Sequence, residues 1–148
     1  MADTPLEQMT GLEVLSAIVD GTIAHPTMAH TLGFRLTEVE EGRAVITGEP
    51  SGDYLNPNGS IHGGWPAAVL DSCMGSSVHS TLPAGAGFTI VECKINFVRP
   101  IVLKTGSVRG EGKIVNVGQK IALAEGVLRD SAGRILATGT TTCLINRA

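Results

Sequence analysis

The first recurring hydrophobic spacing in the chain is that of a short amphipathic helix. Apolar residues recur at helical intervals at Leu12, Leu15, Ile18 and Val19. Thr10 and Glu13 have the spacing of a capping box at its start, and Gly21 suits its end. His25-Pro26 prevents any continuation, because a residue before proline avoids the helical region. The pattern predicts a helix over residues 10–21.

Alternation with a period of two then predicts strands. Residues 33–40 and 43–49 form an expected hairpin around Glu41-Gly42. In residues 89–98 one face carries Thr89, Val91, Cys93, Ile95 and Phe97. Because alternate side chains of a strand point to opposite faces, we expect Thr89 to point toward the helix layer together with the apolar members of this set.

The C-terminal third repeats the pattern of strands and tight turns. Strands are expected over residues 103–115, 120–129 and 134–145, the first bulged near Gly110 and Gly112. The connections at residues 116–119 and 130–133 are short and turn-rich. Successive strands joined in this way predict an antiparallel meander.

Residues 62–81 do not fit the strand pattern. They begin at His62-Gly63-Gly64 with a proline in the first turn, and small or apolar residues then occupy nearly every position. A helix that is apolar all round is buried. The fold class that follows is α+β, with a curved antiparallel sheet wrapped around one long central helix.

Composition and charge narrow the function. The 148 residues are 43% hydrophobic and 17% charged, which excludes a disordered chain and fits one domain. A net charge of −3 and 3% aromatic residues argue against binding to nucleic acid.

Nothing in the sequence predicts a membrane segment or an oxidising compartment. No run of 18 apolar residues occurs, and the N-terminus lacks a basic start followed by an apolar signal core. The three cysteines, Cys73, Cys93 and Cys143, are odd in number and widely spaced, so we expect buried free thiols. A cytoplasmic protein without membrane contact is the expectation.

One charge stands out in the middle of the predicted buried helix. Of the 38 residues between Asp53 and Glu92, only Asp71 carries a formal charge. A carboxylate in apolar surroundings is costly unless it is paired, hydrogen-bonded or used. Asp71 is therefore a candidate catalytic residue; a structural role in pairing with a distant arginine is the alternative.

The sequence offers three further candidates for a site that includes Asp71. His62-Gly63-Gly64 places backbone N–H groups without intrahelical partners at a helix start, where they could stabilise an oxyanion. The amide of Asn56 could donate to a carbonyl or position a water, although Asn before Pro57 also suits a turn. The hydroxyl of Thr89 could hold a water or the Asp71 carboxylate, or simply pack.

These residues together resemble a known family. The stretch from Leu55 to Asp71, with the spacing N-x5-H-G-G-x6-D, resembles the hotdog-fold acyl-CoA thioesterases, most closely the PaaI-like branch of the 4-hydroxybenzoyl-CoA thioesterase superfamily. The resemblance implies a hotdog domain over residues 31–148, preceded by an N-terminal helix and lead-in over residues 1–30. It also implies hydrolysis of acyl-CoA thioesters by dimers or dimers of dimers, the latter being homotetramers.

The resemblance also assigns roles. Asp71 would activate water or attack the thioester, Gly63 would supply the oxyanion N–H, and His62 and Asn56 would support the carbonyl and the leaving thiolate. Thr89 matches a position that orients the water or the carboxylate. Coenzyme A is a polyanion, and the segments of Arg99, Gly118 and Lys120 are those near which the family binds its nucleotide.

Helix geometry adds a further expectation. Gly63 and Asp71 are eight residues apart, or about 12 Å along one helix axis. One thioester carbon cannot easily touch both, but two antiparallel copies of the helix related by a two-fold axis could bring Gly63 of one chain to Asp71 of the other. The resemblance implies the same shared site.

Two other functions compete with hydrolysis by Asp71. A non-catalytic acyl-CoA-binding or regulatory hotdog protein would keep the fold without the chemistry. A cysteine hydrolase would use Cys73, although that residue points away from Asp71 on a helix. No metal or cofactor is expected, since His25, His30, His62 and His79 lack metal-ligand spacing and a thiolate leaves without metal assistance.

Overall fold

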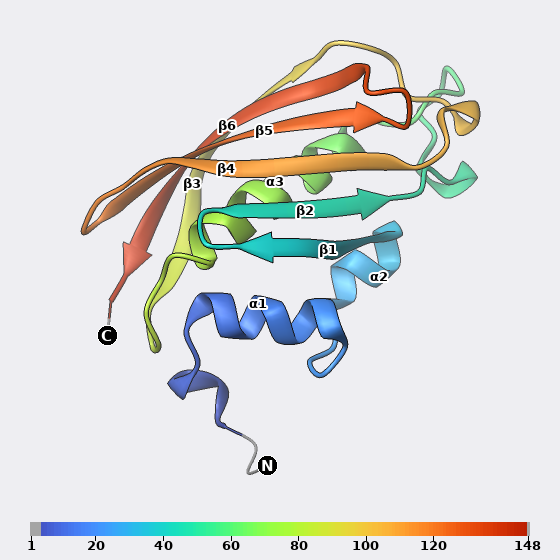
Figure 1. Ribbon diagram of the computed structural model, residues 1–148. Coiled ribbons are helices and arrows are strands. Elements are labelled where there is room, and N and C mark those ends of the chain that lie inside the picture. Colours follow the sequence, from blue (N-terminus) through green and yellow to red (C-terminus); the bar gives the residue numbers. More distant parts are fainter. Residues whose placement is uncertain (1–3, 148) are drawn as a thin grey trace.

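The computed structural model describes residues 4–147, which form a six-stranded antiparallel sheet with a long helix against one face (Figure 1). The helices are α1 (Gly11–Asp20), α2 (Thr27–Leu32) and α3 (Gly64–His79). The strands are β1 (Phe34–Glu40), β2 (Arg43–Gly48), β3 (Gly87–Phe97), β4 (Val108–Val117), β5 (Ile121–Asp130) and β6 (Ile135–Asn146). The expected α+β hotdog arrangement is confirmed.

The strand order differs from a simple meander. The sheet runs β1-β2-β4-β5-β6-β3, so β3 does not follow β2 but lies at the far edge beside β6. The reason is the helix between them: α3 crosses under the sheet and carries the chain from one side to the other (Figure 1). Only β1-β2 and β4-β5-β6 are meanders, because only their connections are short.

The N-terminal segment contains one helix that the pattern predicts and one that it misses. The α1 capping box is present, with the Thr10 hydroxyl accepting from the Glu13 N–H and the Glu13 carboxylate accepting from the Thr10 N–H at 2.7 Å. Gly21 ends α1 with φ at 86°, as expected of a left-handed cap. The six residues of α2 directly after Pro26 are too few to show a period. A domain boundary near residue 30 stays a prediction.

The strand predicted over residues 103–115 begins later than expected. A 3₁₀ turn occupies Leu103–Thr105 and β4 starts at Val108. Its bulge lies between Ile114 and Asn116, not at Gly110 or Gly112. Gly112 has a different use: a Cβ there would overlap the backbone carbonyl of Cys73 in α3. The absence of a side chain lets helix and sheet backbones touch.

The core lies between α3 and the concave face of the sheet. Val69, Leu70, Cys73, Met74 and Val78 of α3 are fully buried there. Of the three free thiols, Cys73 and Cys143 are buried as expected, but Cys93 is exposed on the edge strand β3. No helix within residues 4–147 has the length and hydropathy needed to cross a membrane.

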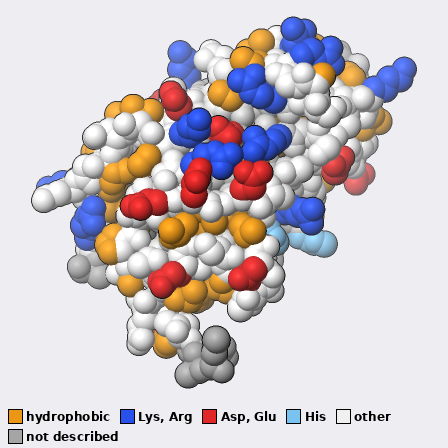
Figure 2. All heavy atoms as spheres, viewed as in Figure 1, with side chains coloured by type: hydrophobic (Ala, Val, Ile, Leu, Met, Phe, Trp, Pro, Cys, Tyr) orange, Lys and Arg blue, Asp and Glu red, His pale blue; other side chains and the backbone are white. Residues whose placement is uncertain are grey.

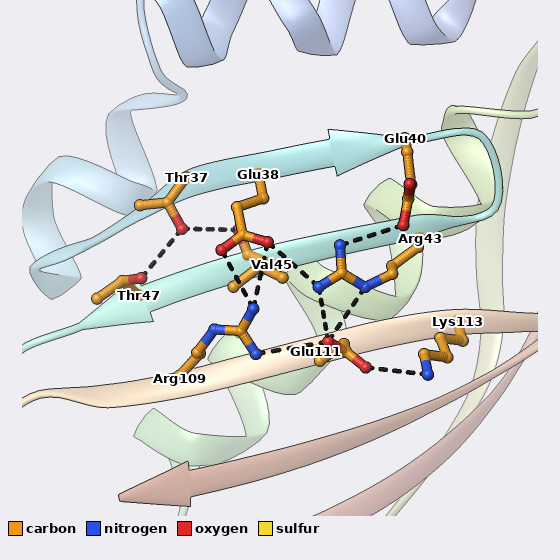
Figure 3. Close-up of polar contacts among 9 residues, drawn as sticks. All are labelled: Thr37, Glu38, Glu40, Arg43, Val45, Thr47, Arg109, Glu111 and Lys113. Atoms are coloured by element: carbon orange, nitrogen blue, oxygen red, sulfur yellow. Dashed lines mark hydrogen bonds and ion pairs between the residues drawn. The ribbon is translucent and has the colours of Figure 1, made fainter. Parts of the chain in front are cut away.

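The outer face of β1, β2 and β4 carries a network of ion pairs (Figures 2 and 3). Its members are Glu38, Glu40, Arg43, Arg109, Glu111 and Lys113. Arg43 bonds Glu111 at 2.9 Å and also reaches Glu38 and Glu40 at 3.2 Å. Exposed pairs of this kind contribute roughly 0.2–1 kcal/mol each. The network therefore marks the solvent side of the sheet more than it stabilises the fold.

Candidate active site

Asp71 lies on the face of α3 that turns away from the sheet. Its neighbours Leu70 and Cys73 are fully buried, whereas Asp71 itself is exposed and borders a cavity beside the helix. The helix is thus buried on one side only, not all round as the sequence predicts. The α3 residues on this open side are small or polar, so a run of small residues conceals two different faces.

The carboxylate of Asp71 is available for chemistry. It makes no ion pair or hydrogen bond with any other residue in the range 4–147. Partial burial by apolar neighbours raises the pKa of Asp71 above that of an ordinary aspartate. Burial, and then the charge of Asp71, raise the pKa of the Cys93 thiol of β3. An unpaired carboxylate with a raised pKa suits a general base or a nucleophile.

The start of α3 presents one free amide. The Gly64 N–H donates to Nδ1 of His62 at 2.9 Å, so the imidazole caps the helix. The Gly63 N–H has no acceptor within residues 4–147, although its carbonyl accepts from Ala67 at 3.2 Å. The ring of Phe97 lies directly beside Gly63, where a Cβ would stand 3.1 Å from the ring carbon Cζ. A free N–H at a helix start is the element of an oxyanion hole.

The structure also fixes the ring nitrogens of His62. Because Nδ1 accepts the Gly64 N–H, a neutral imidazole carries its proton on Nε2, which is the nitrogen left to donate to a ligand. The side chain is exposed at the surface. His62 therefore holds the loop before α3 in place and keeps one donor free.

Asn56 braces the loop before α3. Its Oδ1 accepts from the N–H groups of Asn58 at 2.9 Å and Ser60 at 3.2 Å, and its Nδ2 donates to the Ser60 hydroxyl at 2.9 Å. These bonds fold residues 56–60 into a tight turn, which is the structural reading that the Asn-Pro pair allows. A catalytic role for Asn56 stays a prediction.

The expected direction of Thr89 is wrong. Phe88 and Ile90 line the cavity against α3, while Thr89 between them is exposed and paired with the exposed Leu144. A bulge between Ile90 and Glu92 shifts the alternation, so only after it do Cys93, Ile95 and Phe97 face the helix. One extra residue in a strand reverses the side that each later side chain faces.

The three residues expected near coenzyme A lie at two ends of the sheet. Arg99 follows the end of β3 and borders a hollow with Gly63 and Phe97. Gly118 and Lys120 lie at the β4–β5 turn, where Ile145 of β6 donates its N–H to the Lys120 carbonyl at 2.8 Å. Since Gly87 of β3 pairs with Asn146, that turn is near the other end of β3. Ten residues of strand separate the two groups by roughly 33 Å.

A cavity of about 390 Å³ connects Asp71 to the N-terminal helices. Its walls come from α1, α2, β1, β2, α3 and β3. The two edge strands β1 and β3 both border it, because the sheet curls far enough around α3 to bring its edges to the open side of the helix. The sequence predicts residues 1–30 as an N-terminal helix and lead-in, and no local signal in them indicates a ligand.

The chemistry of the cysteine alternative does not fit. Cys73 is fully buried, its Sγ donates to the Leu70 carbonyl at 3.3 Å, and burial raises the pKa of the thiol to about 12. A thiol in that state is a poor nucleophile at neutral pH. Within residues 4–147 no group of three or more metal-ligating side chains converges. Metal-independent chemistry stays an expectation.

The sequence and the fold match known thioesterases. Residues 58–137, more than half of the chain, match the thioesterase superfamily. The acyl-coenzyme A thioesterase PaaI of Escherichia coli strain K12 is 31% identical over 121 residues, which cover 72% of this chain and 84% of that protein.

Solved structures agree. A phenylacetic acid degradation-related protein of Ralstonia eutropha JMP134 superposes with a TM-score of 0.80 at 29% identity, covering 88% of this chain and 98% of that one. The PaaI protein of the Escherichia coli phenylacetic acid degradation operon gives a TM-score of 0.79 at 18% identity, covering 91% and 95%, which shows the shared fold. The chain therefore belongs to the thioesterase superfamily and is a hotdog-fold thioesterase of the PaaI type.

Proposed function

We propose that this protein hydrolyses acyl-CoA thioesters, with Asp71 as the catalytic carboxylate and the Gly63 N–H as the oxyanion donor. The observation that carries the proposal is that two polar groups, one on α3 and one directly before its first residue, have no hydrogen-bond partner. The Asp71 carboxylate has no partner within residues 4–147, and neither does the Gly63 N–H at the helix start. The name of the similar Escherichia coli enzyme supports acyl-CoA as the substrate class.

Two routes use the same groups. In the first, Asp71 takes a proton from a water while that water attacks the thioester carbon. In the second, an Asp71 oxygen attacks the carbon itself and water then hydrolyses the mixed anhydride. In both, negative charge develops on the carbonyl oxygen opposite Gly63, the C–S bond breaks, and coenzyme A leaves as a thiolate that is then protonated. Incorporation of heavy oxygen from water into Asp71 during a single turnover would identify the second route.

The site requires two chains in this proposal. Gly63 and Asp71 are separated by about 12 Å along α3, too far for one thioester carbon. β3 is an edge strand with one side unpaired in the single chain, and Val91 and Phe97 on it are 57% and 60% exposed. Antiparallel pairing of two β3 strands about a two-fold axis covers these residues and sets the two α3 helices side by side. The assembly is a homodimer or a dimer of dimers.

The same two-fold axis would unite the basic residues. In an antiparallel β3 pair, the end of one strand meets the start of the other. Arg99 of one chain then comes toward the β4–β5 turn of its partner, which carries Gly118 and Lys120. This arrangement supports a binding place for the coenzyme A phosphates that one chain cannot form. No cofactor beyond the substrate is proposed, and a cytoplasmic location stays a prediction from the free cysteines.

The experiment is a thiol-release assay over acyl-CoA substrates from acetyl to long-chain and aryl-acetyl. Hydrolysis that is lost in Asp71→Asn supports the proposal. Binding of acyl-CoA without release of thiol by the wild-type protein would overturn it and favour the non-catalytic alternative.

The oxyanion donor has its own matched pair of variants. Gly63 has φ at −57°, which proline also adopts, so Gly63→Pro removes the N–H and keeps the φ of this residue. Gly63→Ala adds a comparable Cβ beside Phe97 but keeps the N–H. We expect kcat to fall about 100-fold in the proline variant relative to the alanine variant. Equal activity of the two would remove Gly63 from the site.

Subunit mixing tests the shared site. Chains carrying Asp71→Asn are exchanged with chains carrying Gly63→Pro, so that hybrid dimers contain one site with both groups intact. Activity should return to as much as half of the wild-type value per hybrid dimer. Verified exchange without recovered activity would show that the site lies within one chain.

A further inference from the structure

Beyond Asp71, the open face of α3 carries polar side chains without hydrogen-bond partners within residues 4–147. Ser72, Ser76 and His79 all border the cavity and are half-buried. None of their side chains makes a hydrogen bond within residues 4–147. Two other serines of the same segment behave differently: Ser77 donates to the Met74 carbonyl at 2.6 Å and Ser80 to the Ser77 carbonyl at 2.7 Å. The serines that face the cavity are those left without partners.

The wall opposite these groups is mainly apolar. It is formed by side chains of Leu15 and Ile18 from α1, Phe34 and Leu36 from β1, and Phe88 and Ile90 from β3. His25 adds a polar side chain to it, and its buried Nδ1 has no hydrogen-bond partner within residues 4–147. Phe88 also contacts the imidazole of His79, with ring centroids 5.8 Å apart. The cavity is therefore amphipathic: a mainly apolar wall faces a row of hydrogen-bonding side chains along α3.

His79 is suited to bind a neutral polar group. Burial lowers the pKa of its imidazole, so the ring is uncharged at neutral pH and offers one donor and one acceptor. Serine hydroxyls likewise both donate and accept. A purely hydrocarbon ligand would displace water from these groups and leave them without partners, which costs binding free energy.

Helix geometry gives the spacing of the row. Ser76 is five residues and His79 eight residues beyond Asp71, or about 7.5 Å and 12 Å along the α3 axis. The volume of about 390 Å³ lies near the lower end of the ligand-pocket range of roughly 300–1,000 Å³. An extended eight-carbon acyl chain whose thioester lies at Asp71 passes Ser76 and ends short of the backbone of His79, whose side chain leans back toward it because helical side chains tilt toward the N-terminus.

We propose that this cavity is the acyl chamber and that it selects medium-length acyl groups bearing a hydroxyl or keto oxygen in their distal half, which Ser76 and His79 bind. The inference rests on the proposed thioesterase function, because it places the thioester at Asp71. Ser76 and His79 are specificity-determining residues in this view, and Ser72 lies too close to Asp71 to read the distal half.

The first test compares three substrates of one chain length: octanoyl-CoA, 8-hydroxyoctanoyl-CoA and 3-hydroxyoctanoyl-CoA. We expect kcat/KM to be roughly threefold to tenfold higher for the 8-hydroxy substrate than for octanoyl-CoA, as one added neutral hydrogen bond gives. The 3-hydroxy substrate, whose oxygen lies beside the thioester, should show no such preference. Equal kcat/KM for the 8-hydroxy and unsubstituted substrates would overturn the inference.

Variants assign the preference to residues. Ser76→Ala and His79→Leu should each reduce the ratio of 8-hydroxyoctanoyl to octanoyl activity, and together bring it near one. Ser77→Ala is the matched control, since it makes the same change one residue along the same helix, on the sheet side. Melting temperatures confirm that each variant is folded. A ratio that survives the double variant would place recognition elsewhere and contradict the proposal.

A binding measurement separates this inference from the proposed function. Calorimetric titration with 8-hydroxyoctanoate and octanoate needs no turnover. A preference for the hydroxy acid that Ser76→Ala removes supports the chamber even if no thioester is hydrolysed, in which case only the proposed function fails. Thioester hydrolysis without a preference in either assay overturns the chamber and leaves the proposed function intact.

Discussion

The two faces of α3 differ in packing and in chemistry. On the sheet side, Leu70, Cys73 and Met74 are fully buried, and the helix backbone touches the sheet at Gly112. On the open side, Asp71 and Ser76 are accessible and make no side-chain hydrogen bond within residues 4–147. The comparison indicates that one helix stabilises the fold through one face and keeps polar side chains free of partners on the other.

The largest effect should come from Gly112→Ala, which tests the packed face. The new Cβ would overlap the Cys73 carbonyl and the Met74 amide, both backbone groups that move only if α3 shifts. We expect the free energy of unfolding to fall by about 3 kcal/mol. Urea denaturation measures it as a lower midpoint with an unchanged slope.

A matched glycine provides the control for that change. Gly52 has no heavy atom within 4 Å of a built Cβ, so Gly52→Ala should alter stability by less than about 0.5 kcal/mol. If the two alanine variants are equally stable, contact between helix and sheet backbones does not limit the fold.

The next effect tests the open face. Asp71→Asn keeps the shape of the side chain but cannot accept a proton, so kcat should fall at least 100-fold, or about 2.7 kcal/mol of transition-state stabilisation. Stability should hold or rise slightly, because a charge that its surroundings partly desolvate is removed. Asp20→Asn, at the exposed end of α1, is the control. Retention of most of the activity in Asp71→Asn would move the chemistry to another residue.

The pH dependence sharpens the same difference. Burial raises the pKa of Asp71, so the carboxylate ionises at a higher pH than an ordinary aspartate, whose value is 3.8. Activity that needs the ionised form should be present above the raised pKa and lost as the pH falls through it. The acid limb of the kcat/KM profile should therefore lie above pH 3.8 and disappear from the residual activity of Asp71→Asn.

Linkage gives the corresponding change in stability. Because the folded state binds the Asp71 proton more tightly than the unfolded chain, ionisation of Asp71 destabilises the fold as the pH rises from the unfolded value through the raised pKa. Asp71→Asn should thus stabilise the fold more at neutral pH than at a pH below both the unfolded and the folded pKa of Asp71. A difference of the opposite sign would mean that the native carboxylate has a favourable partner.

The smallest effect should come from Thr89→Val. Thr89 points away from α3 and the cavity, so kcat should change by less than about twofold and the melting temperature by little. Ile90→Ala, one residue along on the cavity wall, is the contrasting variant and should lower kcat/KM more. A tenfold loss in Thr89→Val would show that a partner subunit brings this hydroxyl to the site.

The sequence predicts those parts of the fold and of the candidate site that depend on residues close together in the chain. The Thr10 capping box, the turn at Glu41-Gly42 and the glycine pair before α3 each depend on residues a few positions apart. Asp71 could be identified as a candidate because it is the only charged residue in a long neutral segment of the sequence. The sequence does not reveal α2, because its six residues are too few to show a period. It also does not reveal the β3 bulge and the position of β3 beside β6, because both depend on contacts between distant segments.

Hydrophobic period and spacing are properties of neighbouring residues, so they were enough to predict most of the elements, the fold class and the motif from Asn56 to Asp71. The tertiary structure alone decided which groups remain free. It assigned the Gly64 N–H to His62 and left that of Gly63 open, turned Thr89 outward, and placed Ser76 and His79 on a cavity completed by α1 and α2. Whether a polar group is used or free depends on what the distant parts of the chain bring to it, and no local pattern records that.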